Sequence, residues 1–127
     1  MIHLVTGGSG SGKSAYAEQC ILDFGGTRRV YIATMQPFGS EGQARIARHR
    51  KMRAAKKFST IECYTNLKEV ELEPGSDVLL ECMSNLTANE IFDPSGAGKA
   101  RTEEEILAGV SRLAHQAWNP VSYTHLR

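Results

Sequence analysis

A glycine-rich run near the N-terminus, Gly7-x-x-x-x-Gly12-Lys13-Ser14, has the spacing of a phosphate-binding P-loop. Its glycines allow successive backbone N–H groups to turn inward around a phosphate, and the N-terminus of a following helix adds partial positive charge. The Lys13 ammonium would reach the β- and γ-phosphates, and the Ser14 hydroxyl would ligate Mg²⁺. The alternative is a flexible Gly/Ser turn without a ligand. The spacing favours a triphosphate site formed by Gly7, Gly8, Ser9, Gly10, Ser11, Gly12, Lys13 and Ser14.

Two carboxylates follow apolar runs further along the chain. Glu81 ends the run DVLLE, and in P-loop folds a carboxylate at this place holds Mg²⁺ or a water near the phosphates. The alternative for Glu81 is an ordinary strand-end carboxylate at the surface. Glu62, in the segment TIEC, has no independent chemical argument from the residues alone. We therefore predict that Ser14 and Glu81 form a Mg²⁺ site.

A histidine lies in a strongly basic segment, Arg45-Ile46-Ala47-Arg48-His49-Arg50. Seven of the fifteen Lys and Arg residues fall between positions 45 and 57. Neighbouring cations favour the neutral, nucleophilic form of an imidazole, and arginines could stabilise a phosphoryl group in transfer. By spacing alone, a solvated basic helix is the commoner explanation. Binding of nucleic acid is less favoured, because no aromatic residues alternate with the cations.

The elements that position these residues alternate between strands and helices. Short apolar runs bounded by turn residues predict buried strands over residues 2–6, 29–34, 58–63 and 77–83. Helical spacing predicts a helix from Ser14 to Phe24, with helices over 43–56 and 84–92. A further helix begins with a capping box, Thr102-x-x-Glu105. Strands that alternate with helices predict an α/β fold with parallel strands.

Length and composition limit the class of protein. The 127 residues fit one domain, and 15 basic against 14 acidic residues give a net charge of +1, too small to attract nucleic acid or a membrane surface. Three widely spaced cysteines argue against a disulfide scaffold or a structural zinc site and suit a reducing cytosol. Neither a spanning helix nor a signal peptide is recognisable. We expect a cytoplasmic protein that is not inserted in a membrane.

The last nine residues, NPVSYTHLR, continue no recognisable pattern, and Pro120 is expected to end the preceding helix. They resemble the translated read-through of a sequencing adapter, which belongs outside any argument about the fold. We accordingly expect a partial P-loop nucleotide-binding domain over residues 1–118 and a non-native tail over residues 119–127.

Taken together, the motifs resemble one family, the bifunctional adenosylcobinamide kinase/adenosylcobinamide-phosphate guanylyltransferases of cobalamin biosynthesis. The resemblance is carried, in chain order, by LVTGGSGSGKS, YIAT, RIARHR, STIEC and LLEC. It implies a P-loop NTPase-type, mostly parallel sheet flanked by helices. Members of the family are longer, with a further strand–helix–strand portion and an Asn-Glu-Val-Gly motif that this chain lacks. The resemblance therefore implies a sheet that is incomplete at the C-terminus.

The resemblance also implies a function. Such enzymes phosphorylate the aminopropanol hydroxyl of adenosylcobinamide, and then transfer GMP from GTP to that phosphate through a guanylylated histidine. They would use Mg²⁺ with GTP and ATP as substrates, act on a corrinoid and no nucleic acid, and form a trimer. By position, His49 would carry the GMP. Besides the P-loop, the implied nucleotide site comprises Ala33, Thr34, Met35, Arg50, Lys51, Met52, Arg53, Glu62 and Glu81.

Two other functions remain open on the residues alone. One is a different P-loop kinase of small molecules, in which His49 is only a surface residue that contacts phosphate. The other is a nucleotide- or RNA-binding module that uses the basic helix as an electrostatic patch. Covalent retention of the α-phosphate of GTP would distinguish the guanylyltransferase from both.

Overall fold

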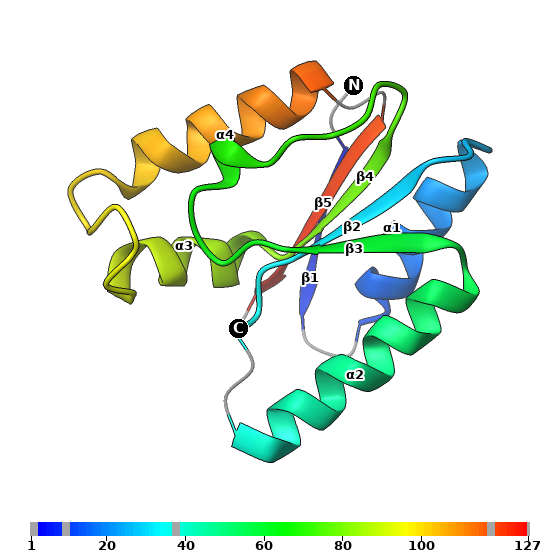
Figure 1. Cartoon of the computed structure of the whole chain (residues 1–127), viewed down its shortest axis with the longest axis horizontal. Helices are drawn as coiled ribbons and strands as arrows, with labels where there is room; N and C mark the ends of the chain where they lie inside the picture. Colours follow the sequence, from blue (N-terminus) through cyan, green and yellow to red (C-terminus); the bar gives the residue numbers. More distant parts are fainter. Residues whose placement is uncertain (1–2, 9–10, 37–38, 117–118, 127) are drawn as a thin grey trace.

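The computed structural model describes residues 3–8, 11–36, 39–116 and 119–126, except for the side chains of Arg45, His49, Met52, Arg53 and residues 119–126. Its elements are β1 (His3–Gly8), α1 (Lys13–Asp23), β2 (Arg29–Ala33), α2 (Gly39–Ala55), β3 (Phe58–Glu62), the short 3₁₀ helix η1 (Leu67–Glu69), β4 (Asp77–Glu81), α3 (Met83–Phe92), α4 (Thr102–Gln116) and β5 (Asn119–Leu126). The strands form a sheet in the order β1-β5-β4-β2-β3, and every pairing in it is parallel (Figure 1). The predicted α/β class with a parallel sheet is confirmed.

Helices cover both faces of this sheet. Helix α1 packs across β1, β5 and β4 on one face, whereas α3, α4 and η1 pack together on the other (Figure 1). Helix α2 lies along the edge strand β3. Because side chains alternate along a strand, Leu79 joins the core under α1 while Val78 and Leu80 join the core under α3 and α4. Strand β4 is thus buried on both faces, as its continuous apolar run predicts.

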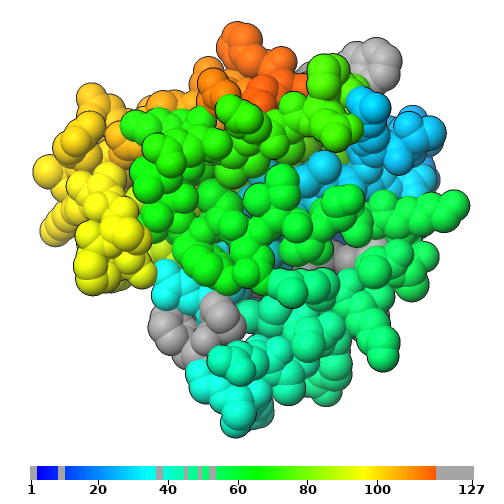
Figure 2. All heavy atoms as spheres, in the orientation of Figure 1, coloured from blue at the N-terminus to red at the C-terminus, as the bar shows by residue number. Residues whose placement is uncertain are grey.

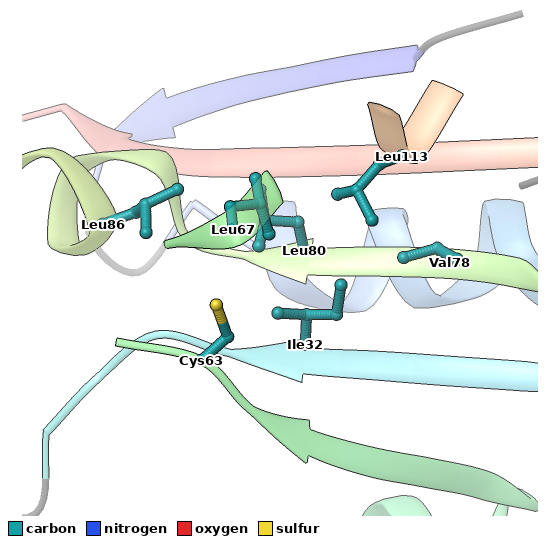
Figure 3. Close-up of a cluster of buried hydrophobic side chains, with 7 residues drawn as sticks. All are labelled: Ile32, Cys63, Leu67, Val78, Leu80, Leu86 and Leu113. Atoms are coloured by element: carbon teal, nitrogen blue, oxygen red, sulfur yellow. The ribbon is translucent and has the colours of Figure 1, made fainter. Parts of the chain in front are cut away.

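Two hydrophobic clusters hold the layers together. The cluster under α1 contains Ala17 and Ile21, both fully buried, at the helical spacing that the sequence predicts. The cluster on the opposite face joins the sheet to Leu67 of η1, Leu86 of α3 and Leu113 of α4 (Figure 3). Burial of a leucine of this kind stabilises a fold by about 1.5–3 kcal/mol. The carboxyl end of β4 is therefore fixed from both sides.

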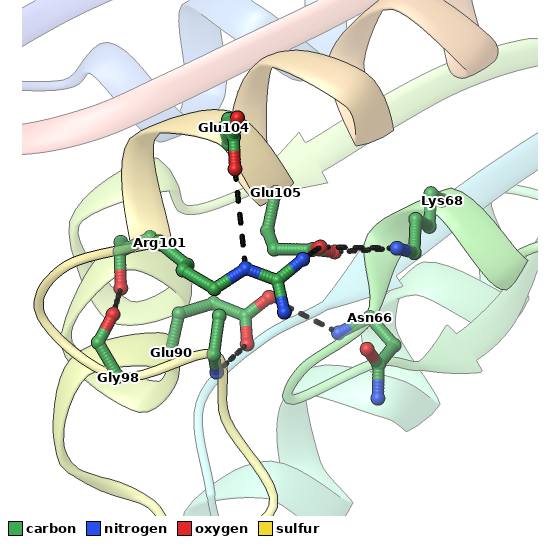
Figure 4. A network of polar contacts seen from close by, with 9 residues as sticks. Asn66, Lys68, Glu90, Gly98, Arg101, Glu104 and Glu105 are labelled. Atoms are coloured by element: carbon green, nitrogen blue, oxygen red, sulfur yellow. Dashed lines mark hydrogen bonds and ion pairs between the residues drawn. The ribbon is translucent and has the colours of Figure 1, made fainter.

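A network of hydrogen bonds and ion pairs stabilises the segments on either side of α3. Glu90 is 1% exposed, and its carboxylate accepts the backbone N–H groups of Asn66 at 3.3 Å and Ala97 at 3.1 Å. Glu105 pairs with Lys68 of η1 and with Arg101 (Figure 4). These contacts hold η1 and the α3–α4 connection to helices α3 and α4.

The predicted elements agree with the structure to within a few residues at each end, but the predicted capping box is wrong. The Thr102 hydroxyl donates to the Gly98 carbonyl at 2.7 Å instead of accepting the N–H of Glu105, which donates to Arg101. The reason is that Thr102 is already the first residue of α4, so its side chain bonds backward along the chain.

Residues 119–126, which show no recognisable sequence pattern, form the interior strand β5 between β1 and β4. Pro120, which lacks an N–H, stands in its second position, aligned with Val78 of β4. A proline near the start of a strand is tolerated because the ladder loses only a terminal hydrogen bond. The non-native origin of residues 119–127, and the division at residue 118, stay predictions.

Candidate nucleotide-binding site

The P-loop connects the end of β1 to the start of α1. Gly12 precedes the helix with a φ of 84°, in the left-handed region that favours glycine. A Cβ added to Gly7 would lie 2.6 Å from the Ser11 hydroxyl oxygen, so the loop packs closely against its own strand. The predicted residues Ser9 and Gly10 lie outside the described residues. The described backbone has the strand–loop–helix form that the motif requires.

Lys13 is the first residue of α1 and is only 6% exposed. Its ammonium donates a hydrogen bond to the Gly8 carbonyl at 3.0 Å, so the charge lies within the loop. A pocket of about 530 Å³ opens beside it, lined by Gly7, Ser11, Gly12 and Lys13 together with Leu4, Val5, Thr6 and Tyr16. A pocket of this volume can accept a small-molecule ligand.

Ser14 and Glu81, the two predicted Mg²⁺ ligands, are in contact. The Ser14 side chain donates a hydrogen bond to the Glu81 carboxylate, although β5 separates the strand before Ser14 from β4. Burial raises the pKa of Glu81 to about 7; the Ser14 hydrogen bond opposes that rise, Glu18 adds to it and Lys13 opposes it. A hydroxyl and a carboxylate are hard oxygen donors, which fit Mg²⁺.

Glu18 is a residue of this region that the sequence analysis missed. It lies one helical turn after Ser14, raises the pKa of Glu81 by its charge, and forms an ion pair with Lys56 at 2.8 Å. The i, i+4 spacing from Ser14 was the available signal, because it places both side chains on one helix face. No group of three or more His, Cys, Asp or Glu side chains suited to a metal occurs among the described residues. The Mg²⁺ fit therefore rests on Ser14 and Glu81.

The predicted residues Ala33, Thr34 and Met35 lie at the carboxyl end of β2, next to the end of β4. Met35 is half-buried, and the Ala33 carbonyl accepts the N–H of Cys63 at 2.9 Å. Thr34 is fully buried and hydrogen-bonds to the backbone of Glu81 and Cys82. The segment thus lies beside Glu81, but the Thr34 side chain points into the protein interior.

The basic segment lies on α2, whose side chains form a ridge at the lower margin of the molecule in Figure 2. Arg50 forms an ion pair with Glu62 at the end of β3, so two predicted site residues meet there. Lys51 is exposed. The side chains of His49, Met52 and Arg53 lie outside the described residues, and the role of His49 as a nucleophile stays a prediction.

A second pocket, of about 590 Å³, opens beyond the end of β3 next to Glu62. Carboxylates of Glu62, Glu69 and Asp93 line it with the polar side chains of Gln36, Tyr64, Thr65, Asn66 and Ser95. These groups suit hydroxyl and amide groups better than a phosphate, which the carboxylates repel. Cys63 also lines this pocket, and burial raises its thiol pKa to about 11, so it is not a nucleophile at neutral pH.

Comparison with known proteins identifies the family. The sequence profile of the family described as cobinamide kinase / cobinamide phosphate guanyltransferase matches residues 3–122. The chain belongs to this family. Over 99 residues it is 40% identical to the bifunctional adenosylcobalamin biosynthesis protein CobU of Escherichia coli (strain K12), and 39% identical to the protein of that name from Salmonella typhimurium (strain LT2). Each match covers 76% of this chain and 53% of the relative.

The match to the cobinamide kinase / guanyltransferase family confirms the family resemblance that the motifs indicated. The parallel sheet with its P-loop agrees with the predicted fold class. The chain spans about half the length of the curated relatives it matches. None of the described helices has the length and apolar character needed to cross a membrane.

Proposed function

We propose that this chain provides the nucleotide site of a two-step enzyme of cobalamin biosynthesis, which phosphorylates adenosylcobinamide and then transfers GMP to the new phosphate. The hydrogen bond between Ser14 and Glu81 carries the proposal, because it joins the P-loop to an acidic strand end. Such a pair is the protein half of a nucleoside triphosphate–Mg²⁺ site. The family description supports the choice of substrates.

In the kinase step, the acceptor hydroxyl oxygen attacks the γ-phosphorus of ATP or GTP. The bond between that phosphorus and the bridging oxygen breaks, the nucleoside diphosphate leaves, and the hydroxyl proton passes to solvent. Lys13 balances charge on the β- and γ-phosphates, and the backbone of residues 7–14 orients them. When bound, Mg²⁺ adds neutralisation of phosphate charge, with Ser14 and Glu81 as its protein ligands.

In the transfer step, an imidazole nitrogen of His49 attacks the α-phosphorus of GTP, and pyrophosphate leaves. An oxygen of the corrinoid phosphate then attacks the same phosphorus, the phosphorus–nitrogen bond breaks, and His49 is regenerated. Arg48 and Arg50 are the sequence neighbours of His49 in α2 and would stabilise the phosphoryl group in transfer. Lys51, Met52, Arg53 and Glu62 complete the nucleotide contacts in this proposal, together with the backbone of Ala33, Thr34 and Met35.

The test is to incubate the chain with Mg²⁺ and GTP labelled at the α- or the γ-phosphate, then denature it. We expect label to remain with the protein only from the α-position, to be lost in acid, and to be absent in His49→Ala. His115→Ala, which removes an exposed histidine of α4, is the matched control and should label like the wild type.

Label retained by His49→Ala would place the nucleophile elsewhere. If neither label remains while the chain hydrolyses GTP, a P-loop kinase without a covalent intermediate replaces the transferase. The choice between ATP and GTP in the kinase step, a trimeric assembly and a cytoplasmic location belong to the same proposal. Binding of nucleic acid is not part of it.

A further inference from the structure

A single hydroxyl joins the ends of β2 and β4. Thr34 directly follows β2 and is 0% exposed. Its hydroxyl oxygen accepts the N–H of Cys82 at 2.7 Å and lies 2.9 Å from the carbonyl oxygens of Glu81 and Cys82, donating to one of them at a time. Its backbone N–H donates to the Glu81 carbonyl at 2.9 Å. The Thr34 side chain therefore extends the β2–β4 ladder past the end of both strands.

The hydroxyl is needed because the backbone it serves is buried. Cys82 is 0% exposed, so its N–H has no access to water, and an unpaired buried N–H costs about 1–3 kcal/mol. Cys82 is also the residue that precedes α3, and its carbonyl accepts the first helical N–H, that of Leu86. Thr34 thus fixes the turn that takes the chain from β4 into α3.

A second bond closes this arrangement from the other side. The Asn89 side-chain amide, almost two turns along α3, donates to the Thr34 carbonyl at 2.7 Å. The end of β2 is therefore bonded both to the β4–α3 turn and to α3 itself. Glu81, the last residue of β4, has its carbonyl held by Thr34 on one side while its carboxylate meets Ser14.

We propose that Thr34 is a positioning residue for the metal-binding carboxylate: its hydroxyl fixes the β4–α3 turn so that Glu81 faces Ser14. The inference rests on the proposed function, in which Ser14 and Glu81 hold Mg²⁺. It gives the Thr34 side chain a role other than contact with the nucleotide.

The test compares Thr34→Val, which keeps the shape but removes the hydroxyl, with Thr34→Ser, which keeps the hydroxyl. Thr87→Val is the matched control, because it removes a threonine hydroxyl whose hydrogen bond, to the Met83 carbonyl, lies within α3. Two readouts are measured in the whole chain. They are hydrogen exchange of the Cys82 amide, and binding of the β,γ-imido analogue of GTP across a Mg²⁺ titration and in EDTA.

We expect Thr34→Val to accelerate exchange at Cys82 and to raise the Mg²⁺ concentration for half-maximal binding about 10-fold, as loss of a partner that orients a ligand does. Binding in EDTA should be unchanged. Thr34→Ser should restore both readouts, and Thr87→Val should match the wild type. Asn89→Ala, which keeps the hydroxyl, should shift the Mg²⁺ dependence in the same direction but less, and it replaces Thr34→Val if that variant does not fold.

Faster exchange at Cys82 with an unchanged Mg²⁺ dependence would overturn the proposal, because Thr34 would then only stabilise the fold. An equal loss of binding in EDTA would overturn it by making Thr34 a nucleotide contact. Failure of the proposed function looks different: the wild-type chain itself would bind the analogue without any dependence on Mg²⁺, and the positioning role would fall with it.

Discussion

The P-loop with Glu81 and the basic helix α2 are held to the sheet differently: α1 behind the P-loop packs on a buried core, whereas no described residue of α2 is buried. Helix α1 anchors the P-loop through Ala17 and Ile21, which are fully buried. Helix α2 is joined to β3 by Arg50 and Glu62, whose side chains are 50% and 41% exposed. Exposed ion pairs contribute about 0–1 kcal/mol and weaken with salt. The core therefore preorganises the phosphate end, whereas the Arg50–Glu62 ion pair between α2 and β3 is open to solvent.

Removal of Lys13 should have the largest effect on function. Lys13→Ala removes the charge that the proposed function places on the β- and γ-phosphates, and we expect transfer of the γ-phosphate to fall by at least about 100-fold. The measurement is single-turnover kinetics with γ-labelled GTP. Lys99→Ala, at an exposed position in the loop before α4, is the control. Wild-type kinetics in Lys13→Ala would contradict the site.

Truncation of the core beneath the P-loop should give the largest loss of stability. Leu79 is fully buried in the cluster under α1, so Leu79→Ala should lower the free energy of unfolding by about 2–5 kcal/mol. Leu107→Ala, at a residue 62% exposed on α4, should change it by less than about 0.5 kcal/mol. Urea denaturation measures both. Equal effects would mean that α1 is not anchored as described.

Titration of Glu81 should make stability depend on pH. Its pKa rises from 4.5 to about 7 in the folded chain, mainly by burial, so the folded state favours the protonated form. The resulting stabilisation is complete below the unfolded pKa and is lost as the pH rises through about 7. Without Mg²⁺, the free energy of unfolding should fall between about pH 5 and pH 8 in the wild type, and less in Glu81→Gln. Parallel pH profiles for the two proteins would refute this assignment.

The smallest effect should come from the exposed ion pair. Arg50→Gln removes the contact with Glu62, and we expect the free energy of unfolding to change by less than about 1 kcal/mol in low salt and by nearly nothing in high salt. The measurement is urea denaturation at two salt concentrations. A loss as large as that of Leu79→Ala would show that α2 is as firmly held as α1, and would remove the contrast between the two regions.

The sequence alone predicted the parts of the site that depend on short spacings. The P-loop needs only glycines, Lys13 and Ser14 within eight consecutive residues, and the run DVLLE needs only apolar residues before Glu81. The alternation of strands and helices likewise predicted a parallel sheet, because parallel neighbours require crossovers. The prediction of a capping box at Thr102 was wrong, because whether a side chain caps a helix depends on which backbone group it reaches in the folded chain.

Contacts between distant segments were decided only by the tertiary structure. The motifs predicted Ser14 and Glu81 as partners at one Mg²⁺ site, but only the fold shows their hydrogen bond across the position of β5. No sequence spacing indicates that Arg50 pairs with Glu62 or that Glu18 pairs with Lys56. The hydrogen bond between the Thr34 hydroxyl and the Cys82 N–H likewise appears only in the fold. The physical reason is that secondary-structure propensity and the spacing of apolar residues determine only which face of its own helix or strand a residue lies on. Which groups lie opposite it depends on strand order and register, and these are set by how the whole chain buries its apolar surface.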